Sequence, residues 1–365
     1  MSKVLVAMSG GVDSSVAALL IRKQGFDCAG ATMKLFAGAD SAENGDSINE
    51  TLAVAKQIGI PFSVFDFTDA FENTVIRHFV ATYENGATPN PCVECNRHIK
   101  FGRFMDAAID AGFDHIATGH YARIEFVNGK YILKKSSDPS KDQSYVLYSL
   151  TQEKLSHTFF PLGGLTKSDV RDVALEHNLI CADKPESQDI CFIPDGDHAG
   201  YIESHGGGKA KHGHIIDTDG KILGEHKGLR RYTVGQRRGL GISAAESLYV
   251  RSINPHDNTV VLGTREHVFS KELYAHDVNL IPIDRLDAPL RVAVKIRYRQ
   301  PEQPATVWQL NDDTLRVEFD SPQRAITNGQ AVVLYDGDTV IGGGTIQTCR
   351  KPTVVIAGPT RNPPV

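Results

Sequence analysis

A serine- and glycine-rich segment directly after the first apolar run constrains the fold of this chain most strongly. Residues 3–8 form an apolar run of strand length, the segment Ser9-Gly10-Gly11-Val12-Asp13-Ser14-Ser15 follows, and residues 13–24 have the pattern of a helix. The glycines let backbone N–H groups approach a ligand, and a helix N-terminus is electropositive. The segment predicts a strand, an anion-binding loop and a helix, although its spacing is neither that of a P-loop nor that of a dinucleotide fingerprint. The plainer interpretation is a turn in which Asp13 or Ser14 only caps the helix.

The alternation of strand-like and helix-like segments continues to about residue 195. Strands are expected at residues 28–36, 61–67 and 115–119, and helices at 69–83 and 101–111. Ser47 and Glu50 form a capping-box pattern that predicts a helix from Ser47 to about Ile58. Such alternation is typical of a doubly wound parallel sheet, whose ligands bind at the carboxyl ends of the strands.

The residue composition and the hydrophobic pattern change after about residue 195 and again near residue 270. Short strands with Gly and His, and no long amphipathic helix, occupy the middle part. The last part alternates at residues 290–296, 305–310 and 314–319, and Asp336-Gly337 marks a hairpin turn. We therefore expect an α/β fold with three domains: a nucleotide-binding catalytic domain at 1–195, a small mixed central domain at 196–269 and a C-terminal β-barrel at 270–360.

Charge and composition indicate a cytoplasmic protein with one basic region. The 365 residues have a net charge of -5, and no apolar run approaches the about 18 residues that span a bilayer. The N-terminus has no leader pattern, so we expect no membrane association. A basic run in the second half is suited to a phosphate backbone, or is only a solvated loop: Lys227, Arg230, Arg231, Arg237 and Arg238.

Six cysteines are too few for a disulfide scaffold, so their placement is more informative than their number. Cys92 and Cys95 form a C-x-x-C that follows Asn90-Pro91, a pattern typical of a helix N-cap with proline at the first helical position. Cys95 is then early in a helix, where we expect the dipole and nearby basic residues to lower the thiol pKa.

Several blocks of sequence, in order over nearly the whole chain, resemble those of the bacterial tRNA-specific 2-thiouridylase (MnmA) family, which belongs to the ATP pyrophosphatases. Besides residues 9–15, they are Asn90-Pro91-Cys92-Val93-Glu94-Cys95-Asn96, Thr118-Gly119-His120-Tyr121-Ala122-Arg123, Lys141-Asp142-Gln143-Ser144-Tyr145, Phe160-Pro161-Leu162-Gly163, Asp189-Ile190-Cys191-Phe192-Ile193, Gly235-Gln236-Arg237-Arg238-Gly239-Leu240-Gly241 and Arg297-Tyr298-Arg299-Gln300.

The resemblance implies ATP-dependent 2-thiolation of the wobble uridine of tRNA. ATP with Mg²⁺ adenylates the 2-oxygen, and a persulfide on Cys191 supplies sulfur while Cys95 is the nucleophile, with a disulfide formed during turnover. A cysteine desulfurase or a sulfur-relay protein is the implied donor. The remaining implied roles are ATP binding by Ala7, Met8, Ser9, Gly10, Gly11, Val12, Asp13, Ser14, Met33 and Gly119, with Asp13 as the Mg²⁺ ligand; target-base binding by Asn90, Pro91 and Cys92; and tRNA binding by His120, Lys141, Asp142, Gln143, Arg297, Tyr298 and Gln330.

Cys92 departs from the family pattern, because many members have Asp at this position. A thiol does not replace a carboxylate in proton transfer near neutral pH unless its pKa is strongly shifted. Cys92, Cys95 and Cys191 are instead suited to an iron–sulfur cluster with one open coordination position, and less well to zinc. An inert buried thiol is the plainer interpretation of Cys191.

Two other functions stay open on the sequence alone. One is an amidating pyrophosphatase with the same phosphate loop, although no glutaminase domain is visible. The other is a non-catalytic, nucleotide-gated RNA-binding protein that uses its cysteines to hold a metal.

Strand alternation puts Arg297 and Tyr298 on opposite faces of a strand. Both side chains therefore contact tRNA only if the strand bends or ends between them.

Overall fold

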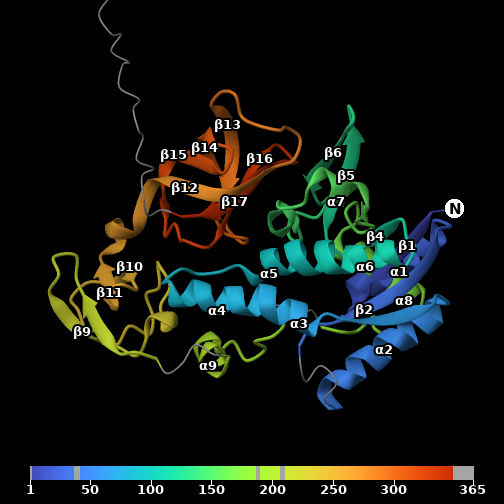
Figure 1. Ribbon diagram of the computed structural model, residues 1–365, viewed down its shortest axis with the longest axis horizontal. Helices are drawn as coiled ribbons and strands as arrows, with labels where there is room; N and C mark the ends of the chain where they lie inside the picture. Colours follow the sequence, from blue (N-terminus) through green and yellow to red (C-terminus); the bar gives the residue numbers. More distant parts are fainter. Residues whose placement is uncertain (1, 37–41, 186–189, 206–209, 348–365) are drawn as a thin grey trace, which may run out of the picture.

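The described strands form three sheets (Figure 1). The computed structural model describes residues 2–36, 42–185, 190–205 and 210–347, and only the backbone of 42–47. The first sheet lies on the right of Figure 1, the middle sheet on the left, and the C-terminal barrel above both. The helices α4 (Arg77–Glu84), α5 (Pro91–Glu94) and α6 (Phe104–Asp110) lie beneath the barrel in Figure 1, so the barrel lies over the segment that carries Cys92 and Cys95.

The first sheet is parallel, with strand order β3-β2-β1-β4-β7. Four strands were expected from the sequence. The edge strand β7 has only two residues, which is too short for a periodicity to be recognised. The strands are β1 (Lys3–Ala7), β2 (Asp27–Lys34), β3 (Phe62–Asp66), β4 (His115–Ala117) and β7 (Thr158–Phe159).

Helices cover this sheet, and two of the helical runs contain π-helical turns. The run expected at residues 69–83 is α3 (Thr68–Phe71), η1 (Glu72–Ile76, π) and α4 (Arg77–Glu84). The run expected at 101–111 begins much earlier, as α5 (Pro91–Glu94), η2 (Cys95–Arg103, π) and α6 (Phe104–Asp110). The other helical segments are α1 (Val12–Lys23), α2 (Ala42–Ile58), η3 (Ser144–Leu147, 3-10), α7 (Gln152–Ser156) and α8 (Lys167–Glu176).

The predicted start of one helix was wrong. The capping-box pattern at Ser47 and Glu50 predicted that a helix begins at Ser47, but α2 begins at Ala42. An N-cap residue has a non-helical backbone, so Ser47 cannot be the cap of a helix whose backbone is already helical before it.

The middle part is a mixed four-stranded sheet with strand order β10-β11-β8-β9. Only β8 and β11 are parallel within it. No long helix occurs among its described residues, as the sequence predicts. The elements are α9 (His198–Ser204), β8 (Gly213–Ile216), β9 (Ile222–His226), η4 (Leu229–Arg231), β10 (Tyr249–Asn254) and β11 (Thr259–Gly263).

The last part is a six-stranded antiparallel barrel, closed by pairing of its first and last strands. The three strands predicted from alternation are present, and Gly337, with φ of 58°, forms the expected hairpin turn. The predicted fold class is therefore confirmed. The elements are η5 (Arg265–Val268, 3-10), β12 (Phe269–Leu280), β13 (Leu290–Lys295), β14 (Gln303–Asn311), β15 (Thr314–Arg324), β16 (Ala331–Asp336) and β17 (Thr339–Ile346).

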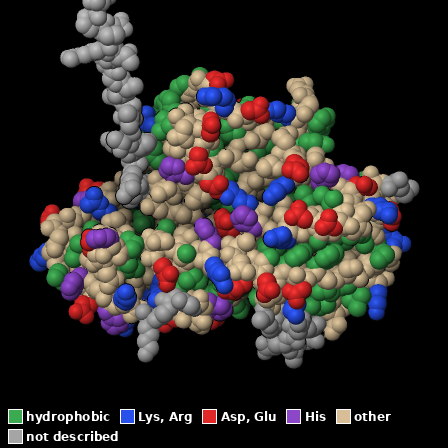
Figure 2. Space-filling view, viewed as in Figure 1, with side chains coloured by type: hydrophobic (Ala, Val, Ile, Leu, Met, Phe, Trp, Pro, Cys, Tyr) green, Lys and Arg blue, Asp and Glu red, His purple; other side chains and the backbone are tan. Residues whose placement is uncertain are grey.

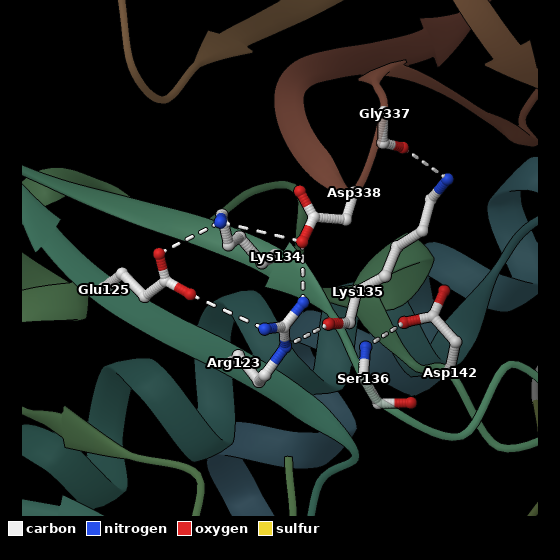
Figure 3. Close-up of polar contacts among 8 residues, drawn as sticks. All are labelled: Arg123, Glu125, Lys134, Lys135, Ser136, Asp142, Gly337 and Asp338. Carbon is white, nitrogen blue, oxygen red and sulfur yellow. Dashed lines mark hydrogen bonds and ion pairs between the residues drawn. The ribbon is translucent and has the colours of Figure 1, made fainter. Parts of the chain in front are cut away.

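A hairpin from the first 195 residues extends the barrel sheet. It consists of β5 (Ala122–Val127) and β6 (Lys130–Lys135), and β6 pairs with β17. Figure 3 shows the polar contacts at this junction: Arg123 Nη2 lies 2.7 Å from Asp338 Oδ2, and Lys135 Nζ donates to the Gly337 carbonyl at 2.8 Å. One cluster of buried side chains contains Leu5 of the first sheet and Tyr335 of the barrel. The barrel and the first sheet thus share a core.

Candidate active site

The loop of residues 9–15 joins β1 to α1 at the carboxyl edge of the first sheet. Gly10 has φ of 74°, a conformation that strains other residues. The Ser9 N–H donates to Ser14 Oγ at 3.1 Å, and Ser15 Oγ donates to the Gly11 carbonyl at 2.8 Å. Gly11 is the N-cap of α1, whose electropositive end therefore faces the loop. This is the strand, loop and helix arrangement that the sequence predicts.

Asp13 lies between a tyrosine and a lysine that are distant in sequence. Its Oδ1 accepts from Tyr121 Oη and from Lys167 Nζ, each at 2.7 Å. A second lysine, Lys184, donates to the Gly10 carbonyl at 3.2 Å and pairs with Glu50. The sequence analysis missed both lysines, because no local motif marks a side chain that reaches the loop from more than 150 residues away.

The other residues for which the resemblance implies ATP binding lie along the same sheet edge. Ala7 and Met8 end β1, Met33 is near the end of β2, and Gly119 follows β4. A Cβ atom on Gly119 would lie 2.9 Å from the backbone of Asp13 and Ser14. Gly119 thus permits close packing against the loop, and the three neighbouring strands bring these residues to one place.

The segment with the C-x-x-C begins as predicted. Asn90 is the N-cap, its side chain accepts from the Val93 N–H at 3.3 Å, and Pro91 is at the first helical position. Cys92 is exposed, and Cys95 is the first residue of the π-helix η2, with 8% of its surface exposed.

The expected low pKa of Cys95 was wrong. Burial raises the pKa of this thiol to about 12, and the neighbouring Lys100 opposes the shift only in part. The two other expected cations are engaged elsewhere: Arg97 pairs with Asp277 of the barrel, and His98 lies 3.4 Å from Glu94. A helix dipole acts mainly within the first turn, and desolvation outweighs it at Cys95.

The fold brings Cys92, Cys95 and Cys191 close together. Each thiol lies in the field of Lys100, and the charges of both Cys92 and Cys191 raise the pKa of Cys95. Cys95 also packs in one apolar cluster with Phe192 and Ile193, directly after Cys191. Cys191 is exposed rather than an inert buried thiol. The described cysteines are all free, so the disulfide expected during turnover is not present in this structure.

The remaining cysteines are away from this cluster. Cys28 and Cys181 are buried in the core beside α1 and β1, whereas Cys349, and Asp189 in the block before Cys191, lie outside the described residues.

Three of the expected tRNA-binding residues are held by short-range hydrogen bonds. His120 is buried, its Nδ1 lies 2.7 Å from Thr118 Oγ1, and burial together with Lys100 lowers its pKa well below the ordinary value. Asp142 is buried and accepts from Ser144 Oγ at 2.8 Å. Gln143 accepts from the Tyr121 N–H at 2.9 Å. The neighbouring Lys141 is half-buried.

The barrel supplies Arg297, Tyr298 and Gln330. Arg297 and Tyr298 lie in a turn just after β13 ends at Lys295, so the bend anticipated from strand alternation exists. Burial and the charges of Asp142 and Cys92 raise the pKa of Tyr298, and the ring centroids of Tyr298 and Tyr145 are 6.0 Å apart. Gln330 Nε2 donates to the carbonyls of Thr88 and Pro89.

The comparisons with known proteins cover most of the chain. Family models match the tRNA methyl transferase HUP domain at residues 2–195, the tRNA methyl transferase PRC-barrel domain at 199–264 and the aminomethyltransferase beta-barrel domain at 270–346. The chain is 49% identical over 353 residues to the tRNA-specific 2-thiouridylase MnmA of Clostridioides difficile, covering 94% of this chain and 98% of that protein. It is 48% identical to the same enzyme of Acetivibrio thermocellus, covering 94% and 99%. The chain belongs to the MnmA family of tRNA-specific 2-thiouridylases.

Membership in the MnmA family confirms the predicted family and the predicted enzyme class, a tRNA-uridine 2-sulfurtransferase. A solved U34-tRNA thiolase, NcsA from Methanococcus maripaludis, aligns with a TM-score of 0.34 and 18% identity over 56% of this chain and 70% of that chain. No helix among the described residues is long and apolar enough to cross a membrane.

The metal ions anticipated for this MnmA family member differ in how well the residues fit them. Among the described side chains, no three Cys, His, Asp or Glu residues form a group arranged to hold a metal ion. Cys92, Cys95 and Cys191 therefore do not fit an iron–sulfur cluster as they stand. Mg²⁺ needs only one or two carboxylates when substrate phosphates supply further oxygens, and Asp13 in the phosphate loop meets that requirement.

Proposed function

We propose that this chain thiolates the wobble uridine of tRNA in an ATP-dependent reaction that yields 2-thiouridine, AMP and pyrophosphate. The observation that carries the proposal is the grouping of Cys92, Cys95 and Cys191. The apolar cluster that holds Cys95 also contacts Met33, near the end of β2 and next to the phosphate loop. The cysteines that would transfer sulfur thus lie near the loop that would bind ATP. Membership in the MnmA family supports the same reaction.

The first step is adenylation. The uridine 2-oxygen attacks the α-phosphorus of ATP, a new P–O bond forms, and pyrophosphate leaves. The loop of residues 9–15 binds the leaving phosphates through backbone N–H groups and hydroxyls, and Lys167 and Lys184 contribute positive charge. A Mg²⁺ ion held by Asp13 and the phosphates would neutralise their charge.

The second step transfers sulfur. The terminal sulfur of a Cys191 persulfide attacks C2 of the base, and AMP leaves with the oxygen. Cys95 then attacks Sγ of Cys191, so that the S–S bond to the transferred sulfur breaks, the sulfur stays on C2, and a Cys95–Cys191 disulfide forms. Two equivalents of a cellular thiol reduce this disulfide. Lys100 stabilises the sulfur anions that act in this second step, because its field reaches all three cysteines.

The tRNA is placed across the barrel and the middle part. Asn90, Pro91 and Cys92 face the target base, and other parts of the tRNA are bound by His120, Lys141, Asp142, Gln143, Arg297, Tyr298 and Gln330. Figure 2 shows Lys, Arg and His side chains gathered near the centre of one face, below the barrel, where an RNA phosphate backbone finds positive charge. A cytoplasmic cysteine desulfurase or sulfur-relay protein loads Cys191.

A metal cluster on the three cysteines is the competing mechanism at the same site. The three thiols influence one another's charge, which favours a metal cluster. Among the described residues, however, they are not arranged as a group that holds a metal ion. Iron analysis of protein purified without oxygen separates the two mechanisms. We expect no stoichiometric iron in active protein, and iron that activity requires would contradict the persulfide route.

The test compares two cysteine variants in two assays. Cys191→Ala should abolish 2-thiouridine formation on mass spectrometry of tRNA nucleosides and preserve the first turnover of tRNA-dependent pyrophosphate release, because adenylation does not use the thiol. Cys181→Ala is the control, since Cys181 is a buried free thiol in another cluster. Continued thiolation by Cys191→Ala would overturn the assigned persulfide site.

A further inference from the structure

The loop that leads to the target-base residues is held by the barrel. Residues 85–90 connect α4 to the Asn90 cap, and their backbone meets the turn of residues 327–330. The Thr88 N–H donates to the Asn328 carbonyl at 2.8 Å, and Gln330 Nε2 donates to the carbonyls of Thr88 at 2.9 Å and Pro89 at 3.0 Å. Residues about 240 positions apart in sequence are thus joined directly before Asn90.

Both amide hydrogens of Gln330 are used in this contact. A glutamine side-chain nitrogen carries two N–H donors, and each of them meets one loop carbonyl. A phosphate or base acceptor of tRNA would have to compete with these two bonds, whereas Oε1 of Gln330 is suited to accept from a ribose hydroxyl. The amide nitrogen is therefore committed to the protein and not to RNA.

The turn that carries Gln330 is itself fixed. The Gly329 N–H donates to the Ile346 carbonyl at 2.9 Å, and the Ile346 N–H donates to the Gln330 carbonyl at 2.8 Å, at the end of β17. Gly329 has φ of 84°, and a Cβ atom there would lie 2.9 Å from the Thr88 carbonyl oxygen. Close approach of the two loops therefore requires glycine at this position.

The same turn is also tied to the middle part. Arg297 Nη2 donates to Thr327 Oγ1 at 2.9 Å, to the Ala325 carbonyl at 3.0 Å and to the Val234 carbonyl at 3.3 Å. Val234 directly precedes the block that holds Arg237 and Arg238. One set of hydrogen bonds therefore runs from the middle part, through the barrel turn, to the loop before Cys92.

We infer that Gln330 is a positioning residue for thiolation: it holds residues 88–90 so that Asn90 caps α5 and Cys92 faces the target base. This inference rests on the proposed function and deepens it. Held in this way, the loop is ordered before tRNA arrives, and binding does not have to order it. A role only as a tRNA contact would affect binding and leave the loop as it is.

Gln330→Met tests the inference, because methionine has similar length and no N–H donor. Amide hydrogen exchange in peptides covering residues 85–96 should become about tenfold faster in the free protein, as expected from the loss of two hydrogen bonds at about fivefold or less each. The kcat for 2-thiouridine formation should fall about tenfold, while KM for tRNA changes less than about threefold.

The control is Gln303→Met on β14, whose side-chain amide contacts only the nearby Pro301 carbonyl, at 3.5 Å. Gln330→Asn, which is one methylene too short to reach the loop, provides a second variant if Gln330→Met unfolds. Unchanged exchange in residues 85–96, faster exchange without a fall in kcat, or a rise in KM alone would each overturn the inference. The exchange measurement needs neither ATP nor tRNA, so it stands or fails separately from the proposed thiolation.

Discussion

Burial has a larger effect on the pKa of each thiol in the site than the helix that carries Cys95 has. Cys95 is at the start of a π-helical turn, yet loss of solvation raises its pKa to about 12. Cys92 and Cys191 reach the surface, and partial loss of solvation raises the pKa of each as well. Near neutral pH all three are therefore protonated in the free protein, and reaction requires the cation Lys100 or the bound substrate to favour the thiolate.

This account predicts a dependence of thiol reactivity on pH. Because each folded-state pKa lies above the ordinary thiol value, alkylation of Cys92 and Cys191 by iodoacetamide should still be rising above pH about 9. Lys100→Met should slow alkylation at pH 8, since removing the positive charge raises the pKa further. Peptide mass spectrometry measures both effects, with the exposed Lys56→Met as control; equal rates in the two variants would contradict the assigned role of Lys100.

A second residue-scale prediction concerns the lysine beside the phosphate loop. Lys167 Nζ lies 2.7 Å from Asp13, and its side chain is only 12% exposed. Lys167→Met should lower tRNA-dependent pyrophosphate release at subsaturating ATP by about 10- to 100-fold, the range for loss of a hydrogen bond to a charged group. Lys211→Met, at an exposed position, is the control. Pyrophosphate release equal to that of the unmodified protein would remove Lys167 from the ATP site.

At the scale of elements, the sequence predicted regular segments better than their interruptions. Strand and helix periodicity predicted four strands of the first sheet and three of the six barrel strands, and the Asn90-Pro91 pair predicted the helix cap. Periodicity did not reveal the π-helical turns at residues 72–76 and 95–103, because such a turn is defined by i→i+5 backbone hydrogen bonds, and no local residue pattern in the sequence marks them. Local sequence patterns also did not predict where α2 starts or that β7, with two residues, is a strand.

Contacts between distant elements explain what the sequence could not predict of the site. The phosphate loop, the cap and the cysteines each have a local pattern, and the resemblance supplied their roles. Lys167 and Lys184 have no such pattern, and neither does the hydrogen bond of Gln330 to residues 88 and 89. These side chains become functional only through the tertiary fold.

The close contact between the β4 end and the phosphate loop gives a prediction at this scale. Gly119→Ala should abolish most ATP-dependent pyrophosphate release, because the added methyl group would press on the backbone of Asp13 and Ser14 at 2.9 Å. Overpacking of this kind costs about 1–3 kcal/mol of unfolding free energy. Gly164→Ala is the matched control, since no atom lies within 4 Å of its added Cβ. Normal release by the Gly119 variant would show that the loop does not bind ATP.

At the scale of the whole molecule, the barrel and the first sheet act as one body around the site. They share a core cluster, the hairpin β5–β6 extends the barrel sheet, and Gln330 reaches the loop before Asn90. The acidic net charge is a poor guide to the partner, because the basic run lies apart in the middle part, on the side expected to meet RNA.

The basic run leads to a prediction about tRNA binding. Arg237 and Arg238 are exposed, and replacing both with Glu should weaken tRNA binding and make its dependence on salt shallower by about one to two units of slope. The double variant Lys3→Glu, Lys56→Glu changes the net charge equally on the first domain and should bind tRNA with nearly unchanged slope. Equal slopes for the two double variants would show that the basic run is only a solvated loop.

The central claim is that this chain places sulfur on the wobble uridine of tRNA. Its most direct test is mass spectrometry of nucleosides from unmodified tRNA incubated with the protein, ATP, Mg²⁺ and a persulfide donor. The account predicts 2-thiouridine at the wobble position, formed with AMP and pyrophosphate in equal amounts and absent when ATP is omitted. Release of pyrophosphate without any sulfur in the tRNA, or sulfur incorporation that does not need ATP, would contradict it.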